Sequence, residues 1–154
     1  MSKPNYSFTQ SSFLMLCRVE IDIKARADVI WNLLTDAKNF PRWNSTVTSI
    51  EGEILDGEQL RLRVPGTNRI FTPRISGVVP RERMIWTGGF WPVFKGVRTF
   101  ELRQCDDVST NFSMRECFSG MMLPLLKRSL PDFRPVFERY AQDLRLEAER
   151  TKAK

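Results

Sequence analysis

The sequence predicts an α+β fold in which an antiparallel sheet packs against one long C-terminal helix. Apolar and charged residues alternate along residues 17–24 and along several segments after residue 46, as expected for half-buried strands. Turn-forming dipeptides separate these later segments. From Phe133 onward the apolar residues recur at helical spacing instead. Consecutive strands with the helices kept apart from them are typical of α+β domains.

The chain opens with a strand followed by two short helices. Residues 17–24 read CRVEIDIK, an alternation that turns Cys17, Val19, Ile21 and Ile23 inward. A helix follows, and Asp28 is its expected cap, because a carboxylate can accept the free N–H groups of a first turn. The pattern breaks near Asp36, and a second helical piece runs over residues 39–43. The apolar stripe of the first helix is Val29, Ile30, Leu33 and Leu34.

The middle of the chain is predicted to form about six consecutive strands. The dipeptide Gly66-Thr67 suits a hairpin turn with glycine first. A loose aromatic loop is expected over residues 88–96. The connection over residues 120–126 is unusually apolar, and forms either an exposed mouth or a short helix packed under the end of the sheet. The predicted strands cover residues 46–53, 59–64, 69–79, 83–87, 98–104 and 110–118.

A long amphipathic helix ends the chain. Its apolar face is formed by Phe133, Val136, Phe137, Tyr140 and Leu144, which share one side of an α-helix. Residues 150–154 are expected to fray. We predict a single domain over residues 13–150, preceded by a flexible tail over residues 1–12, because the first ten residues are polar.

Composition excludes several function classes. The 154 residues include no histidine, which rules out histidine-based acid–base catalysis and removes the commonest metal ligand. The three cysteines are widely spaced and indicate reduced thiols. No segment approaches the roughly 20 apolar residues of a membrane span. We therefore expect a soluble, cytoplasmic protein without stable membrane insertion, cofactor or metal.

Residues 21–44 read IDIKARADVIWNLLTDAKNFPRWN, and residues 115–126 read RECFSGMMLPLL. These two segments resemble the SRPBCC superfamily, which includes START lipid-transfer domains, birch-pollen-allergen-like proteins and polyketide cyclase/dehydrase-like proteins. The resemblance implies a helix-grip fold, with a curved antiparallel sheet of about seven strands wrapped around the C-terminal helix. It also implies two short helices after the first strand and an internal cavity. Many relatives of the polyketide cyclase/dehydrase-like branch carry a histidine where this chain has Arg98, so no role of that histidine is carried over.

The strand registers that keep one face apolar predict which side chains face the helix. They place Leu62 opposite Phe71, Ile75 opposite Trp86, Leu102 opposite Phe112 and Phe100 opposite Met114. They also place Arg98 opposite Glu116 on the same face. The ligand-binding residues predicted in this way are Leu62, Phe71, Ile75, Trp86, Arg98, Phe100, Phe112, Met114, Glu116, Phe133, Phe137 and Tyr140.

The Arg98–Glu116 pair is open to two interpretations. A lone charge is costly to bury, so the two side chains are expected to pair. The interpretation we favour is a structural ion pair near the end of the sheet. The other is a polar anchor that orients a ligand, with Tyr140 supplying a hydroxyl. Large apolar residues on facing elements ordinarily fill a core, and only the resemblance favours a cavity here.

Three functions compete. The first is binding of a small hydrophobic molecule, such as a lipid, polyketide or aromatic metabolite, oriented by Arg98, Glu116 and Tyr140. The alternative is a cyclase, dehydratase or hydrolase that would use Glu116 as acid or base and Arg98 as an electrophilic clamp. Because this is the alternative and not the favoured function, we assign no catalytic residue from the sequence. The third is a protein-interaction role, like that of the co-chaperones of this superfamily.

The charge pattern does not indicate a nucleic-acid partner. The net charge is +6, but the basic residues are scattered among acidic ones and form no continuous block. The oligomeric state stays open, with a homodimer as one option.

Overall fold

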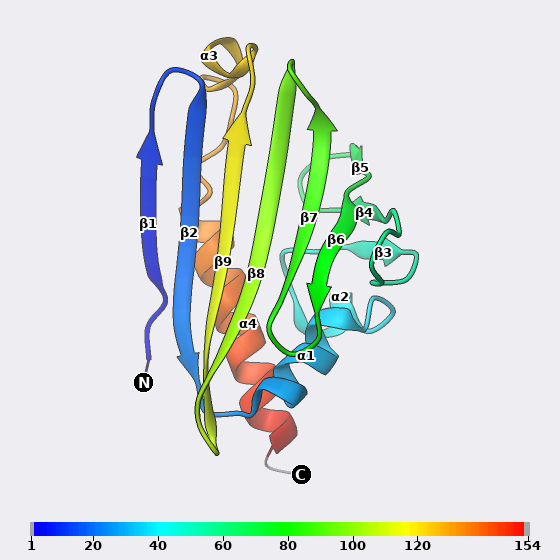
Figure 1. Ribbon diagram of the computed structural model, residues 1–154, viewed down its shortest axis with the longest axis vertical. Coiled ribbons are helices and arrows are strands. Elements are labelled where there is room, and N and C mark those ends of the chain that lie inside the picture. Colours follow the sequence, from blue (N-terminus) through cyan, green and yellow to red (C-terminus); the bar gives the residue numbers. More distant parts are fainter. Residues whose placement is uncertain (1, 153–154) are drawn as a thin grey trace.

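A computed structural model describes residues 2–152 and shows two layers, an antiparallel sheet and a long helix behind it (Figure 1). Within these residues the main sheet has six strands in the order β1-β2-β9-β8-β7-β6. The helix is α4 (Arg134–Lys152). This arrangement confirms the predicted helix-grip type of α+β fold. The six strands are β1 (Asn5–Gln10), β2 (Leu14–Ile23), β6 (Arg74–Val79), β7 (Arg83–Phe90), β8 (Phe94–Asp106) and β9 (Ser109–Ser119).

The predicted registers are confirmed in the hairpins that carry the apolar face. Ile75 pairs with Trp86 across β6 and β7. Phe100 pairs with Met114 across β8 and β9, in the ladder that also holds the predicted charged pair. Directly opposed residues of antiparallel strands share one face of the sheet. That face is packed against α4, where Phe137 is fully buried.

The strands between residues 49 and 71 form a separate small sheet instead of continuing the main one. It consists of β3 (Ser49–Glu51), β4 (Arg61–Arg63) and β5 (Ile70–Phe71), in that order. The predicted strand over residues 69–79 is split because Pro73 has no N–H to donate to a ladder. Backbone bonds still tie the small sheet to the main one, with Leu60 N donating to Pro73 O at 2.9 Å. Leu62 and Phe71 pair as predicted, but outside the main sheet.

The expectation of an N-terminal tail over residues 1–12 is corrected for residues 5–10. These residues form β1, an edge strand paired along its whole length with β2. Tyr6 explains why a polar segment pairs, since its ring meets that of Phe137 on α4 edge-on at 6.1 Å between centroids. This aromatic contact adds to the backbone hydrogen bonds. The limits of the single domain otherwise stay a prediction.

The two short helices follow β2 as predicted, but the cap of the first differs. They are α1 (Ala27–Thr35) and α2 (Phe40–Trp43). Arg26, not Asp28, is the N-cap of α1, and its side chain makes no capping bond. The Ala27 N–H instead donates to Gln104 Oε1 of β8 at 2.8 Å. A side chain distant in sequence therefore satisfies the start of this helix.

Both predicted connections are more regular than expected. Strand β7 continues to Phe90 and β8 begins at Phe94, so the aromatic loop shrinks to a turn over residues 91–93. In the second connection a short helix forms, α3 (Leu123–Leu126), with Leu123 buried. The short helix of the second alternative therefore forms, but Met121, Met122 and Leu125 are exposed, as the first alternative expected. Figure 1 shows α3 and the β7–β8 turn at the same end of the molecule.

Candidate functional site

The candidate site centres on an ion pair on the inward face of the sheet. Arg98 of β8 and Glu116 of β9 are ladder partners, and Arg98 Nε lies 2.5 Å from Glu116 Oε2. The predicted pairing of these side chains is therefore confirmed. The two side chains are 23% and 14% exposed. Solvent therefore reaches part of this pair.

Buried side chains continue this row on both sides. Trp86 of β7 is the ladder partner of Arg98, and Cys17 of β2 is that of Glu116. Arg98 also lies over the ring of Phe137, with Cζ 5.4 Å from the ring centroid. Such a cation–π contact favours a cation in an apolar setting. The guanidinium is thus held between a carboxylate and an aromatic ring.

Buried hydrogen-bond donors near Arg98 lack partners among the described residues. They include Trp86 Nε1 and Tyr140 Oη. Both rings pack on Phe100, with centroids 5.1 Å and 6.0 Å away. Burial raises the pKa of Tyr140, while the positive charge of Arg98 acts in the opposite direction. The Tyr140 hydroxyl is therefore protonated at neutral pH and available as a donor.

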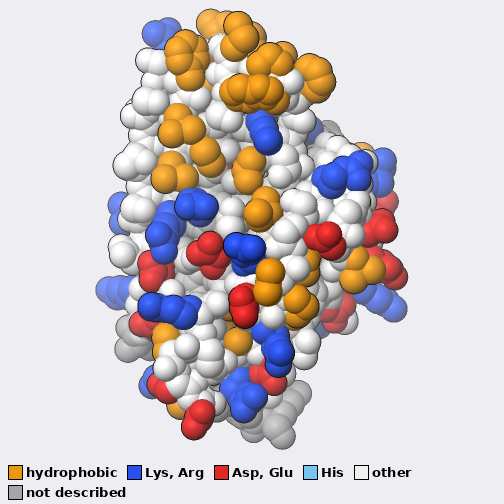
Figure 2. Space-filling model, viewed as in Figure 1, with side chains coloured by type: hydrophobic (Ala, Val, Ile, Leu, Met, Phe, Trp, Pro, Cys, Tyr) orange, Lys and Arg blue, Asp and Glu red, His pale blue; other side chains and the backbone are white. Residues whose placement is uncertain are grey.

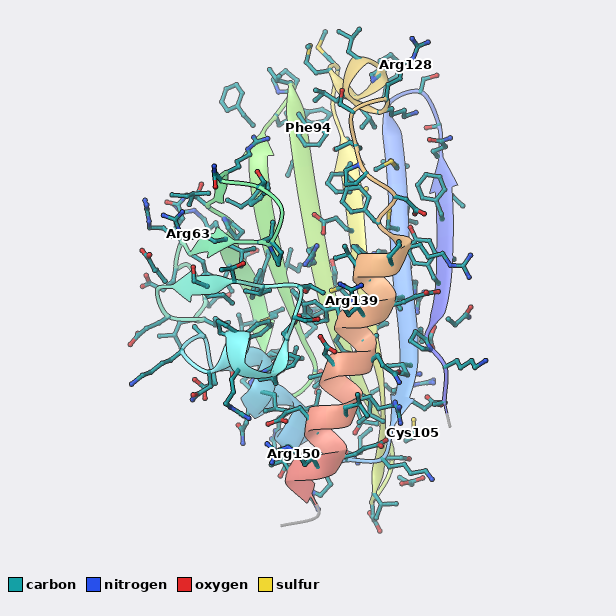
Figure 3. All side chains as sticks on the ribbon, turned by 180° about the vertical axis from the view of Figure 1, so that it is seen from behind. Arg63, Phe94, Cys105, Arg128, Arg139 and Arg150 are labelled. Atoms are coloured by element: carbon teal, nitrogen blue, oxygen red, sulfur yellow. The ribbon has the colours of Figure 1, made fainter. Side chains whose placement is uncertain are left out.

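A chain of phenylalanine rings leads from the pair toward one end of the sheet. Phe137 meets Phe133 at 6.1 Å, Phe133 stacks on Phe118 at 5.1 Å, and Phe118 stacks on Phe94 at 5.7 Å. Phe94 and Phe133 are only half-buried. Figure 3 places Phe94 near the end of the molecule that carries Arg128. The chain of rings therefore reaches the surface toward this end.

Buried side chains also pack across the interface between the sheet and α4. Phe112 stacks on Tyr140 at 6.3 Å between centroids, and Met114 is fully buried. Two pockets lie away from this interface. One, of about 920 Å³, is on the outer face of the sheet among charged side chains, and the other, of about 440 Å³, lies beside β6 and β7. None of the predicted ligand-binding residues lines either of these two pockets.

Most of the predicted ligand-binding residues meet between the main sheet and α4, but two do not. Leu62 is buried in the small sheet. Phe71 is 37% exposed, and the Arg69 guanidinium covers its ring at 5.4 Å. Leu62 and Phe71 do not lie on the face that packs against α4, because the split at Pro73 separates the small sheet from the main sheet. The residues that do meet there are Ile75, Trp86, Arg98, Phe100, Phe112, Met114, Glu116, Phe133, Phe137 and Tyr140.

Tyr6 is a neighbour of the site that sequence reasoning missed. Its hydroxyl forms a hydrogen bond with the thiol of Cys17, and burial raises the pKa of both groups. Cys17 is therefore held as a protonated thiol at neutral pH, which makes it a poor nucleophile. The alternation of Tyr6 and Phe8 within a polar segment was the available signal, and it is too short to predict a strand.

Neither a metal centre nor a membrane-spanning helix is found in the described part of the chain. Within residues 2–152, no three or more Cys, Asp or Glu side chains are placed to hold a metal ion. No helix in the same range combines the length and apolar character needed to cross a membrane.

Comparison with known proteins identifies the family. Residues 17–153 match the family described as polyketide cyclase/dehydrase and lipid transport. The chain belongs to this family. The polyketide cyclase/dehydrase and lipid transport family is part of the SRPBCC group, whose members bind hydrophobic ligands or act as cyclases. The predicted resemblance is thereby confirmed. No curated protein matches the chain.

Solved structures similar to this member of the polyketide cyclase/dehydrase family share its fold at low identity. Norcoclaurine synthase from Thalictrum flavum is 15% identical, with a TM-score of 0.71, covering 94% of this chain and 99% of that one. An aromatase/cyclase from a Streptomyces species is 18% identical, with a TM-score of 0.68 and coverage of 90% and 96%. A START superfamily protein from Mycobacterium smegmatis is 18% identical, with a TM-score of 0.65 and coverage of 88% and 98%. Such similarity shows the fold alone.

Proposed function

We propose that this chain binds a small hydrophobic ligand between the main sheet and α4, with a ligand oxygen held beside Arg98. The observation that carries the proposal is the gathering of donors on one apolar face. Arg98 is partly exposed, and Trp86 Nε1 and Tyr140 Oη are buried without acceptors among the described residues. A few fixed polar groups in apolar surroundings orient a ligand. Since all three groups donate, they favour a carbonyl, carboxylate or sulfonate oxygen.

The charged pair leaves Arg98 able to serve such an oxygen. Its contact with Glu116 is made through Nε, whereas a guanidinium has five N–H donors. A buried donor without an acceptor costs about 1–3 kcal/mol. A ligand oxygen that accepts a hydrogen bond from Trp86 or Tyr140 would remove part of that cost. The free energy of binding would therefore include the gain from supplying an acceptor that the free protein lacks.

The ligand is expected to approach from the end where Phe94 and Phe133 are half-buried. Because Phe133 stacks on Phe118 with centroids 5.1 Å apart, these rings must move apart for a ligand to enter between them. Contact between the ligand and the phenylalanine rings offsets the free energy needed to move the rings apart. This contact contributes about 25 cal/mol per Å² of apolar area buried, less the free-energy cost of association. Membership of a family with hydrophobic-ligand binders supports this use of the interface.

The test uses anilinonaphthalene sulfonate, a hydrophobic anion that fluoresces when shielded from water. We expect it to bind the wild-type protein and to lose about fivefold in affinity in Tyr140→Phe, which removes one hydrogen bond. Since the Tyr140 hydroxyl has no partner among the described residues, this variant should keep or slightly raise the free energy of unfolding. Native mass spectrometry of the purified protein would show whether a small molecule accompanies it.

Tyr6→Phe is the matched control, because the hydroxyl of Tyr6 is already bonded to Cys17. It should bind the probe as the wild type does. Equal affinity of the wild type, Tyr140→Phe and Arg98→Met would place the probe elsewhere and contradict the proposal. Loss of binding in Tyr6→Phe alone would contradict it as well.

An enzymatic use of the same pair is the second candidate. The observation that favours it is Glu116, a partly exposed carboxylate on an otherwise apolar face and beside a cation. A cyclase- or hydrolase-type reaction would use Glu116 as acid or base and Arg98 to polarise a carbonyl. Glu116→Gln should then abolish turnover of a copurified compound while retaining its binding. Unchanged turnover in that variant would exclude this role.

A further inference from the structure

One end of the molecule exposes a cluster of large apolar side chains. They come from three segments distant in sequence: the β1–β2 turn, the β7–β8 turn, and the connection around α3. Figure 2 shows hydrophobic side chains gathered at this end. We call this cluster the apolar end; its exposed members are Phe13, Leu14, Phe90, Trp91, Val93, Met121, Met122 and Leu125.

Hydrogen bonds join the three segments into one surface. Met121 N donates to Pro92 O and Met122 N to Val93 O, each at 2.9 Å. The Lys127 ammonium donates to the Ser11 carbonyl oxygen. These bonds join the three segments to one another, so the exposed side chains do not belong to three independent loops. A contiguous exposed apolar patch of this kind marks a contact surface.

The three segments that form the apolar end carry charges of one sign. Residues 7–17, 88–97 and 117–131 contain Lys95, Lys127 and Arg128 but no aspartate or glutamate. The whole chain has 18 acidic residues, so the lack of aspartate and glutamate in all three segments distinguishes them from the rest of the chain. Figure 3 shows Arg128 beside α3. The surface thus combines exposed apolar side chains with an uncompensated positive charge.

We propose that the apolar end docks on the surface of a bilayer that contains anionic lipids. Trp91 and Phe90 would lie at the level of the headgroups, where aromatic rings are favoured, and Met121 and Leu125 would reach the acyl chains. Lys95, Lys127 and Arg128 would face lipid phosphates. A second copy of this chain fits the same surface less well, because pairing two such ends would oppose their like charges. Docking of this kind is peripheral and needs no membrane-spanning segment.

Trp91 is a built-in reporter of this contact. It is 62% exposed, whereas Trp31, Trp43 and Trp86 are at most 9% exposed. We expect the protein to cosediment with vesicles of phosphatidylcholine and phosphatidylserine, and its fluorescence to shift to shorter wavelength. Vesicles of phosphatidylcholine alone should bind at least about fivefold more weakly, and added salt should weaken binding to the anionic vesicles. Trp91→Phe should remove most of the spectral shift.

Two double variants separate the apolar and electrostatic contributions. Met121→Ser with Leu125→Ser should lower the vesicle partition coefficient at least about tenfold. Lys95→Glu with Arg128→Glu should lower it about tenfold or more for anionic vesicles and little for neutral ones. The matched controls are Leu146→Ser and Lys38→Glu, which change an exposed apolar residue and an exposed cation on other elements. Both should bind as the wild type does.

Three outcomes would overturn the proposal: equal binding to neutral and anionic vesicles, undiminished binding in both double variants, or a dimer in solution that Met121→Ser with Leu125→Ser dissociates. The last would assign the apolar end to self-association. The ligand site is tested separately, since Tyr140→Phe should leave vesicle binding unchanged.

Discussion

Glu147 is a buried carboxylate held by arginines of two helices. Arg42 Nη2 of α2 lies 2.6 Å from Glu147 Oε1, and Arg150 of α4 donates to both carboxylate oxygens at 2.8 and 3.0 Å. Hydrogen bonds from Arg150, then those from Arg42, lower the pKa of Glu147 below its ordinary 4.5, against the opposing effect of burial. The pair with Arg42 joins α2 to the C-terminal half of α4.

This geometry predicts a pH-dependent stability. The folded-state pKa of Glu147 lies below the unfolded one, so its contribution is complete above about pH 4.5 and is lost as the pH falls toward the lowered value. Glu147→Gln should lower the free energy of unfolding at neutral pH by about 1–2 kcal/mol. Urea unfolding of both proteins from neutral pH to pH 3 measures this. A difference that grows as the pH falls would contradict the assignment.

Gly120 determines how closely the α3 connection approaches the β7–β8 turn. Its φ is +134°, and an added Cβ would overlap the Val93 carbonyl oxygen. Gly120→Ala should therefore cost about 3 kcal/mol or more of the free energy of unfolding. Gly66→Ala is the control, since Gly66 also has a positive φ of +85° but open space around it, and should cost about 1–2 kcal/mol. Equal unfolding midpoints for the two variants would show that the close approach is unimportant.

Among elements, β1 departs most from its sequence pattern. The segment is polar, yet it pairs with β2 from Asn5 to Gln10, and Tyr6 packs on Phe137. Deletion of residues 1–12 should lower the free energy of unfolding by about 2–4 kcal/mol, because it removes the Tyr6 contact and uncovers the edge of β2. A flexible tail would instead be removed at no cost. Chemical denaturation of the full and shortened chains, with Tyr6→Ala as a partial control, decides between these outcomes.

The elements whose patterns were strong agree with their predictions. Strands β8 and β9 alternate clearly on both sides of the turn near residue 107, so their register, including Arg98 opposite Glu116, followed from the requirement for one apolar face. The stripe of α4 was equally clear, and Phe137, Tyr140 and Leu144 are buried as expected, but Val136, predicted on the same face, is 42% exposed. The division between the two sheets was not predicted, because alternation continues through residues 69–79 and only the position of Pro73 marks the break.

At the scale of the whole molecule, the two sheets should differ in local stability. Strands β2, β8 and β9 form long, continuous ladders at the centre of the main sheet, whereas β3, β4 and β5 have two or three residues each. We expect amides of residues 14–23 and 94–119 to open with free energies at least about 2 kcal/mol higher than those of residues 49–71. Hydrogen exchange followed by mass spectrometry measures this, and uniform protection would contradict it.

The sequence by itself determined the fold class, the order of the main elements, the inward face of the long strands and the pairing of Arg98 with Glu116. These depend on local periodicity, on turn residues and on the cost of exposing apolar side chains, all of which act within about 20 residues of chain. Only the tertiary structure decided that β1 joins the sheet, that Phe71 faces solvent, and that Gln104 satisfies the start of α1. It also decided that Phe112 stacks on Tyr140 between the sheet and α4, and that three segments distant in sequence assemble the apolar end. Each of these depends on contacts between segments that are distant in sequence. The shape of the folded molecule sets the strength of such contacts, and the periodic pattern of the sequence does not report them.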